Sequence, residues 1–124
     1  MPKAKASEAF ITAYIECALW ATTDNTDDSG GEPLDANYDA DDLTKACRKQ
    51  MVDDCHDFVG LCEREGQPFN ESDEYAGHDF FLTRYGHGAG FWDRGLPNGE
   101  ELSKLAKTFG DVYLYVHRKR IHHG

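Results

Sequence analysis

The sequence predicts an α+β domain in which a small antiparallel or mixed sheet packs against about three helices, with a single layer of each. Apolar residues recur at helical spacing in three segments, 7–21, 40–65 and 98–109. Two further segments, 79–85 and 111–117, have the composition or the alternation of strands. A chain of 124 residues has room for one hydrophobic core, so we expect one domain over 1–124.

The first two helices are predicted by their caps and by their apolar stripes. Ser7 is placed to cap the first helix, whose inner face carries Phe10 and Tyr14. Asp39 or Asp41 is expected to cap the second. Its stripe follows steps of four and three residues: Leu43, Cys47, Met51, Cys55, Phe58 and Cys62. Gly66 then follows as a typical helix-ending glycine.

The C-terminal half is predicted to contain two strands and a third helix. Residues 78–85 (HDFFLTRY) are rich in aromatics and short for a core helix, which favours a strand. Asn98 is expected to cap the third helix, with Glu101 completing a capping box. The basic end around residues 118–123 is expected to be solvated. Eight residues are expected in the core: Leu43, Met51, Phe58, Leu102, Leu105, Phe109, Val112 and Leu114.

The charge balance is strongly acidic. Thirteen Lys and Arg face 23 Asp and Glu, a net charge of −10. Such a surface repels polyanions and favours basic partners, so we expect no direct nucleic-acid binding and no membrane association. The N-terminus, Met-Pro-Lys-Ala-Lys, lacks the apolar stretch of a secretion signal, and a cytoplasmic location is therefore expected.

The four cysteines are expected to be reduced core residues. Cys17, Cys47, Cys55 and Cys62 fall at apolar positions of the helical patterns, where a free thiol acts as a small hydrophobic group. Zinc is disfavoured because the chain has no Cys-x-x-Cys pair.

An acidic loop is predicted over about 24–42. Asp24, Thr26, Asp28, Gly30, Glu32 and Asp35 follow the spacing of a calcium-binding EF-hand loop. However, Ser29 occupies the position that requires glycine, and Asp35 replaces the bidentate glutamate. A solvated loop is favoured, and no metal or cofactor is expected.

A glycine-rich turn is predicted over about 86–95, within the segment 77–95 that holds the densest set of His, Asp, Arg, Trp and Gly residues. Gly86, Gly88 and Gly90 allow positive φ and close approach of another backbone or a ligand. In a functional interpretation, His87 is an acid or base, Asp93 orients it, and Arg94 holds an anionic substrate.

Other residues of this segment complete the motif. His78 and Arg84 share one face of the expected strand, and Trp92 is expected to offer a stacking surface at the side of the small cleft. The alternative is a purely structural turn, which the sequence favours, so a non-catalytic protein is preferred over an enzyme.

Several segments resemble small acidic proteins of unknown function encoded by tailed bacteriophages. The similar strings are AYIECALW at 13–20, SGGEPLD at 29–35, GHDF at 77–80, GHGAGFWDRG at 86–95 and VYLYV at 112–116. The resemblance implies a phage protein that works in the bacterial cytoplasm, and it implies no specific activity.

Two hypotheses follow. The first is a phage accessory protein that binds and modulates a basic host protein, as a DNA-mimicking anti-defence factor or in host takeover. Its binding surface comprises acidic residues of the loop and of the second helix: Asp24, Asp27, Asp28, Glu32, Asp53, Asp54 and Asp57. The alternative is a small ligand-binding or catalytic domain with its site at His87, Asp93 and Arg94.

Overall fold

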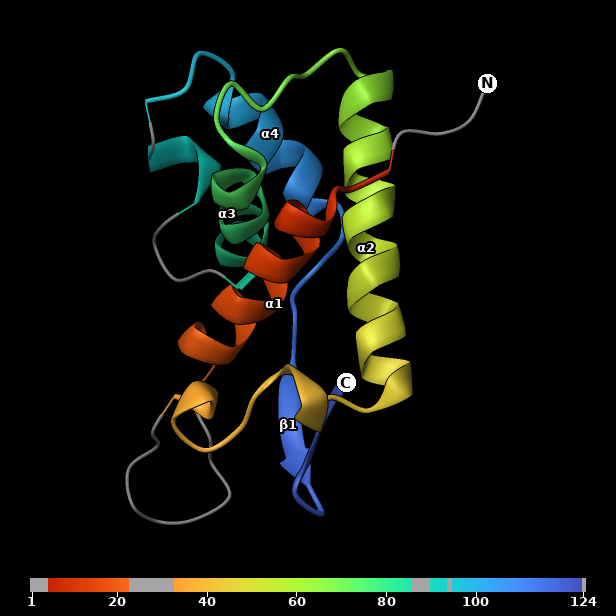
Figure 1. Cartoon of the computed structure of the whole chain (residues 1–124). Helices are drawn as coiled ribbons and strands as arrows, with labels where there is room; N and C mark the ends of the chain where they lie inside the picture. The colour runs from red at the N-terminus through yellow and green to blue at the C-terminus, as the bar shows by residue number, and fades with distance from the viewer. Residues whose placement is uncertain (1–4, 23–32, 86–89, 94, 124) are drawn as a thin grey trace.

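The computed structural model describes residues 5–22, 33–85, 90–93 and 95–123. Within these residues the chain forms four α-helices, three short 3₁₀ helices and one two-stranded sheet (Figure 1). The elements are α1 (Glu8–Ala21), η1 (Leu34–Ala36), η2 (Ala40–Asp42), α2 (Lys45–Arg64), α3 (Asp73–Tyr85), η3 (Phe91–Asp93), α4 (Gly99–Lys107), β1 (Leu114–His117) and β2 (Arg120–His123). The predicted α+β class is confirmed.

The prediction of a strand at 79–85 is wrong, because residues 73–85 form the helix α3. Ser72 caps this helix by accepting a hydrogen bond from the backbone N–H of Tyr75 at 3.2 Å. Asp73 and Glu74 then place negative charge in its first turn, next to the positive end of the helix dipole. Burial extends around most of the helix, which removes the polar face that usually identifies a helix in a sequence.

The sheet is a hairpin at the C-terminus, and β2 lies where a solvated basic end was expected. Strand β1 pairs antiparallel with β2, so that Val116 lies opposite Ile121. Arg118 and Lys119 form the two-residue turn with φ of 53° and 61°. The outer edge of β2 is covered where the backbone N–H of Thr44 donates to the carbonyl of Ile121 at 3.0 Å. The hairpin lies at the end of the molecule opposite α4 (Figure 1).

The helix ends agree in part with the expected caps. The Ser7 side chain accepts from the backbone N–H of Phe10 at 3.1 Å, as predicted. Helix α2 begins at Lys45 with Thr44 as its cap, because Asp39 instead forms a capping box with Asp42 around η2. Gly66 ends α2 with φ of 69°, as predicted.

The predicted capping box of α4 does not form. Asn98 occupies the cap position, but its side-chain amide donates to the Pro68 carbonyl at 2.7 Å and to Gln67 Oε1 at 3.0 Å. These bonds tie the start of α4 to the α2–α3 connection.

The core is built from aromatic rings contributed by α1, α2 and α3 and by the connecting segments. The Phe58 and Phe80 rings stack with centroids 4.0 Å apart, and Tyr14 packs on Phe80 at 5.1 Å. Of the eight residues expected in the core, Leu105 and Phe109 are half-buried. The other six are buried: Leu43, Met51, Phe58, Leu102, Val112 and Leu114.

The expectation of four reduced, buried cysteines is confirmed. Burial raises the pKa of Cys47 to about 11 and the pKa of Cys62 to about 12. Burial, together with the neighbouring Asp54 carboxylate, also raises the pKa of Cys55. These thiols therefore resist ionisation in the folded protein.

Helices α1 and α3 approach each other closely at Gly77. A Cβ atom at this position would overlap the carbonyl oxygen of Phe10, which belongs to the α1 backbone. Only a residue without a side chain permits this contact. The same contact holds α1 and α3 side by side.

Gly77→Ala is therefore expected to destabilise the fold by about 2–3 kcal/mol, because neither backbone has room to move without loss of packing. Chemical denaturation measures the change. Gly66→Ala provides the control: a Cβ there meets no atom within 4 Å, so only the left-handed backbone contributes, at about 1 kcal/mol. Equal losses in the two variants would contradict the close contact.

The cysteines give a second expected outcome. Four thiols should react with a colourimetric reagent in denaturant, and slowly or not at all in the native state.

The raised pKa values also predict how stability depends on pH. Since the folded pKa values of the thiols lie above the unfolded value of about 8.5, the stabilisation that comes from burying neutral thiols is complete below that pH. It is lost as the pH rises through the folded values. Unfolding free energy measured from neutral to alkaline pH should therefore fall, and a rise would contradict the burial.

Candidate functional site

Most of the site residues predicted in the glycine-rich turn lie outside the residues that the structure describes. Gly86, His87, Gly88 and Arg94 lie outside the described residues, and so does the side chain of Asp93. Gly90 packs against α3, where a Cβ would overlap the Thr83 hydroxyl oxygen. Trp92, in η3, is about half exposed. The proposed group of His87, Asp93 and Arg94 therefore stays a prediction.

Arg84 was expected on one face of a strand, as part of the motif around the glycine-rich turn, but it is buried among the helices. Its guanidinium donates to Asp54 Oδ2 and to the Tyr14 hydroxyl, both at 2.9 Å. It also donates to the carbonyl oxygens of Phe109 at 3.1 Å and Gly110 at 3.0 Å. The pKa of Tyr14 is raised by burial, although the Arg84 charge opposes this shift. This is a structural network, because its side chains are almost entirely buried.

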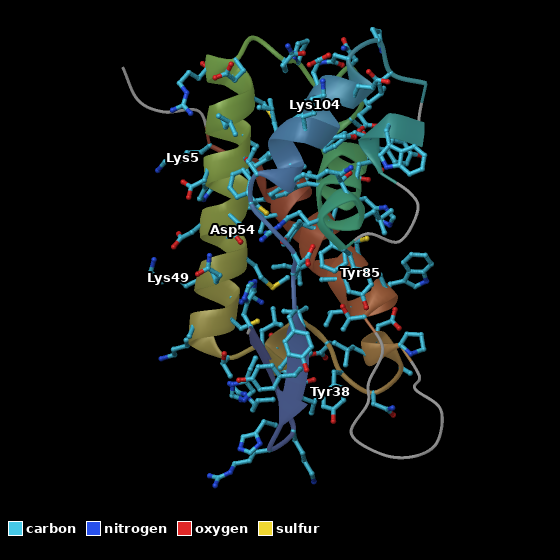
Figure 2. All side chains as sticks on the ribbon, turned by 180° about the vertical axis from the view of Figure 1, so that it is seen from behind. Lys5, Tyr38, Lys49, Asp54, Tyr85 and Lys104 are labelled. Atoms are coloured by element: carbon cyan, nitrogen blue, oxygen red, sulfur yellow. The ribbon has the colours of Figure 1, made fainter. Side chains whose placement is uncertain are left out.

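The predicted acidic surface is divided by the structure. Asp24, Asp27, Asp28 and Glu32 lie outside the described residues. On α2, Asp57 is exposed. Asp53 pairs with Lys49 at 2.6 Å, and Lys49 lies on the outer side of the helix (Figure 2). Asp54 is 8% exposed and pairs with Arg84, so little of its carboxylate is available to a partner. A continuous acidic surface on α2 is not formed by these three carboxylates.

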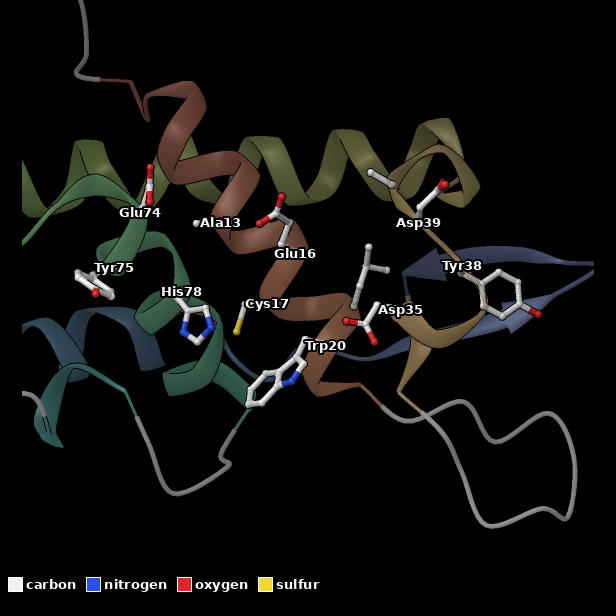
Figure 3. A pocket seen from close by; sticks show the side chains of 12 residues that line it. Ala13, Glu16, Cys17, Trp20, Asp35, Tyr38, Asp39, Glu74, Tyr75 and His78 are labelled. Carbon is white, nitrogen blue, oxygen red and sulfur yellow. The ribbon is translucent and has the colours of Figure 1, made fainter.

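The best candidate site is a groove of about 740 Å³ between α1, α3 and the η1–η2 segment (Figure 3). We call it the acidic groove. Helix α1 lines it with one stripe at helical spacing, Ala13, Glu16, Cys17 and Trp20. Helix α3 contributes Glu74, Tyr75 and His78, and the η1–η2 segment contributes Asp35, Tyr38 and Asp39.

Local hydrogen bonds hold the three walls in place. Leu34 is buried, and its backbone N–H donates to the Thr22 carbonyl at 2.9 Å, which anchors η1 to the end of α1. The Ser7 hydroxyl donates to Asp73 Oδ2 at 2.7 Å and joins the starts of α1 and α3. The groove is therefore set by the same packing that brings Gly77 against α1.

The lining combines carboxylates with exposed rings. Trp20 is 58% exposed and lies 6.1 Å from His78 between ring centroids, and Tyr75 is 59% exposed. A second hollow of about 330 Å³ continues along α1 and adds Glu8. Among the described residues that line the two hollows, none is Lys or Arg. Five carboxylates thus surround aromatic surface: Glu8, Glu16, Asp35, Asp39 and Glu74.

This arrangement is suited to binding organic cations. Carboxylates next to exposed aromatic rings attract organic cations, above all the guanidinium group, which stacks on rings and pairs with carboxylates. The described residues contain no group of three or more His, Cys, Asp or Glu side chains placed to hold a metal ion. Nor does any helix within those ranges have the length and apolar character of a membrane span.

No protein-family model, curated protein or solved structure matches the chain.

Sequence reasoning placed the acidic residues in a loop and on α2, and it missed the groove. The signal available in the sequence was Trp20, which follows Glu16 by four residues and therefore shares a helical face with it. That face joins α3 only because residues 73–85 are helical, and the predicted strand concealed this.

Asp54→Asn is expected to destabilise the protein by about 3 kcal/mol or more, because it leaves the Arg84 charge buried without its counter-ion. Asp57→Asn is a matched control on the same helix, and at an exposed position it should stay within about 0.5 kcal/mol. Thermal and denaturant unfolding measure both. A neutral Asp54→Asn would mean that the carbonyl oxygens alone satisfy Arg84.

Proposed function

We propose that this protein is a phage accessory protein that binds a basic segment of a host bacterial protein in its acidic groove and thereby modulates that host protein. One observation carries the proposal: five carboxylates surround exposed aromatic rings in two adjoining hollows whose described lining has no Lys or Arg. The resemblance of the sequence to small acidic phage proteins supports the viral origin, and with it a role in anti-defence or host takeover.

The chemistry of the groove fits arginine better than lysine. A guanidinium can lie flat on Trp20 and donate to a carboxylate such as Glu16 or Asp35 at the same time. The volume of about 740 Å³ falls in the range that encloses drug-sized molecules, so several side chains of a bound segment fit. Affinity then comes from stacking and charge together, not from charge alone.

Segment binding is favoured over imitation of a DNA duplex. A duplex presents about one charge per 1.7 Å of its axis, in two continuous rows. Here the carboxylates come from three elements and surround aromatic surface, while Asp54 is withdrawn into the core. A concave site with rings is suited to side chains of a flexible segment.

The test uses an arginine-rich peptide, followed through the fluorescence of Trp20 in a Trp92→Phe background. The peptide should shift this fluorescence, and a lysine-only peptide of equal length and charge should bind more weakly. Binding should weaken as salt rises, since the screening length falls from about 10 Å at 0.1 M to about 3 Å at 1 M.

Two fourfold variants with equal change in net charge separate the groove from general acidity. The first neutralises the groove by Glu16→Gln, Asp35→Asn, Asp39→Asn and Glu74→Gln. The second neutralises the outer side of α2 and its end by Asp53→Asn, Asp57→Asn, Glu63→Gln and Glu65→Gln.

The groove variant should lose at least about tenfold in affinity, and it should also lose the host protein captured from bacterial lysate by the native chain. The α2 variant should keep both. Equal weakening in the two variants would show that only net charge matters, and no weakening in either would place the interface elsewhere.

A further inference from the structure

The C-terminal hairpin has two chemically different faces. Its inner face carries Leu114, Val116 and Ile121, which pack on the core. The register places Tyr115 opposite His122 and His117 opposite Arg120, so these four side chains share the outer face. Tyr113, two residues before Tyr115, continues the same row and is 65% exposed.

The outer face forms a continuous row of rings. The Tyr113 and Tyr115 rings stack with centroids 5.8 Å apart, and Tyr115 stacks on His122 at 5.2 Å with an interplanar angle of 13°. His117 meets His122 edge-on at 5.8 Å. A row of this kind leaves the flat face of its terminal ring, Tyr113, accessible to another planar group.

Cations gather at the turn of the same hairpin. Arg118, Lys119 and Arg120 are consecutive and exposed. Arg118 and Lys119 have φ of 53° and 61°, the left-handed pair of angles for which two-residue hairpins strongly prefer Asn-Gly. The chain thus carries two cations at positions where its backbone favours small, neutral residues.

We propose that this hairpin binds single-stranded nucleic acid: a base stacks on Tyr113, at one end of the row of rings, and phosphates farther along the same strand pair with Arg118, Lys119 and Arg120 at the turn. Aromatic residues beside cations on a sheet surface are the usual components of single-strand binding. Duplex DNA is disfavoured, because its bases already stack on one another and the acidic body repels its dense charge. The expectation against nucleic acid followed from the net charge, and the local charge of the hairpin is opposite.

The site is independent of the acidic groove and shares no residue with it. Stacking distinguishes a nucleic acid from an acidic protein, since a carboxylate-rich segment offers charge to Arg118 but no flat ring to Tyr113. An acidic polypeptide is therefore the competing occupant that the experiment must separate.

The test measures the fluorescence anisotropy of a labelled thymidine single strand of about 12 nucleotides at low salt. The first variant, Arg118→Asn with Lys119→Gly, removes two charges while supplying the preferred turn sequence, so the hairpin should stay folded. The second, Tyr113→Thr with Tyr115→Thr, removes the stacking rings and keeps residues that favour strands.

Two controls match these changes. Lys104→Gln with Lys107→Gln removes the same charge from exposed positions on α4 (Lys104 is labelled in Figure 2). Tyr75→Thr removes an exposed ring from the acidic groove. Circular dichroism verifies the fold of every variant.

We expect the native chain to bind the single strand more tightly than a duplex of equal length, and each hairpin variant to weaken binding by about tenfold, which is the loss of one stacked base or its charge partners. Both controls should bind like the native chain. The proposal is overturned by any of three results: no binding at low salt, equal loss in the α4 control, or competition by polyglutamate as strong as by unlabelled strand.

Discussion

The rest of the structure depends on the need to satisfy one buried charge. Arg84 is 5% exposed, and a guanidinium with so little access to water requires partners for its donors. These partners come from separate parts of the chain: Tyr14 on α1, Asp54 on α2, and the carbonyls of Phe109 and Gly110 after α4. Because their positions are fixed relative to one guanidinium, the three helices and the segment leading to β1 are oriented together. Both surfaces proposed for binding follow from that orientation.

The sequence predicted the type of an element correctly where one face of that element is polar. It predicted the wrong type where the element is buried on most sides. The stripe on α2 from Cys47 to Cys62 is buried on one side and exposed on the other, so its period identifies the helix. Helix α3 is buried on most sides, and its run of aromatics resembles a strand. Only the first strand of the hairpin was predicted, because Leu114 and Val116 alternate with polar or exposed residues. The second strand was missed, because its pairing depends on the bridge between Ile121 and Leu43 and on a turn without glycine.

Site prediction failed for a related reason. Charge is visible in a sequence, but the sequence does not show which carboxylates serve the fold. Asp53, Asp54 and Asp57 are equivalent by composition and differ entirely in role, since only Asp54 faces Arg84. The groove in turn brings α1 and α3 residues together from some 60 positions apart, as in the pair of Trp20 and His78. No local sequence pattern predicts that residues so far apart in the chain come into contact.

The net charge of −10 does not reveal that the chain carries one acidic and one basic surface. The acidic groove ends at η2, where Asp39 lies, and the chain continues directly to Leu43, which bridges Ile121 of the hairpin. The two surfaces are therefore joined through one short segment, Ala40–Asp42 and Leu43. Under the two proposals together, a basic protein carrying a single strand meets both at once, the protein in the groove and the strand on the rings. Since the groove repels phosphate and the turn repels cations, each surface disfavours the ligand proposed for the other.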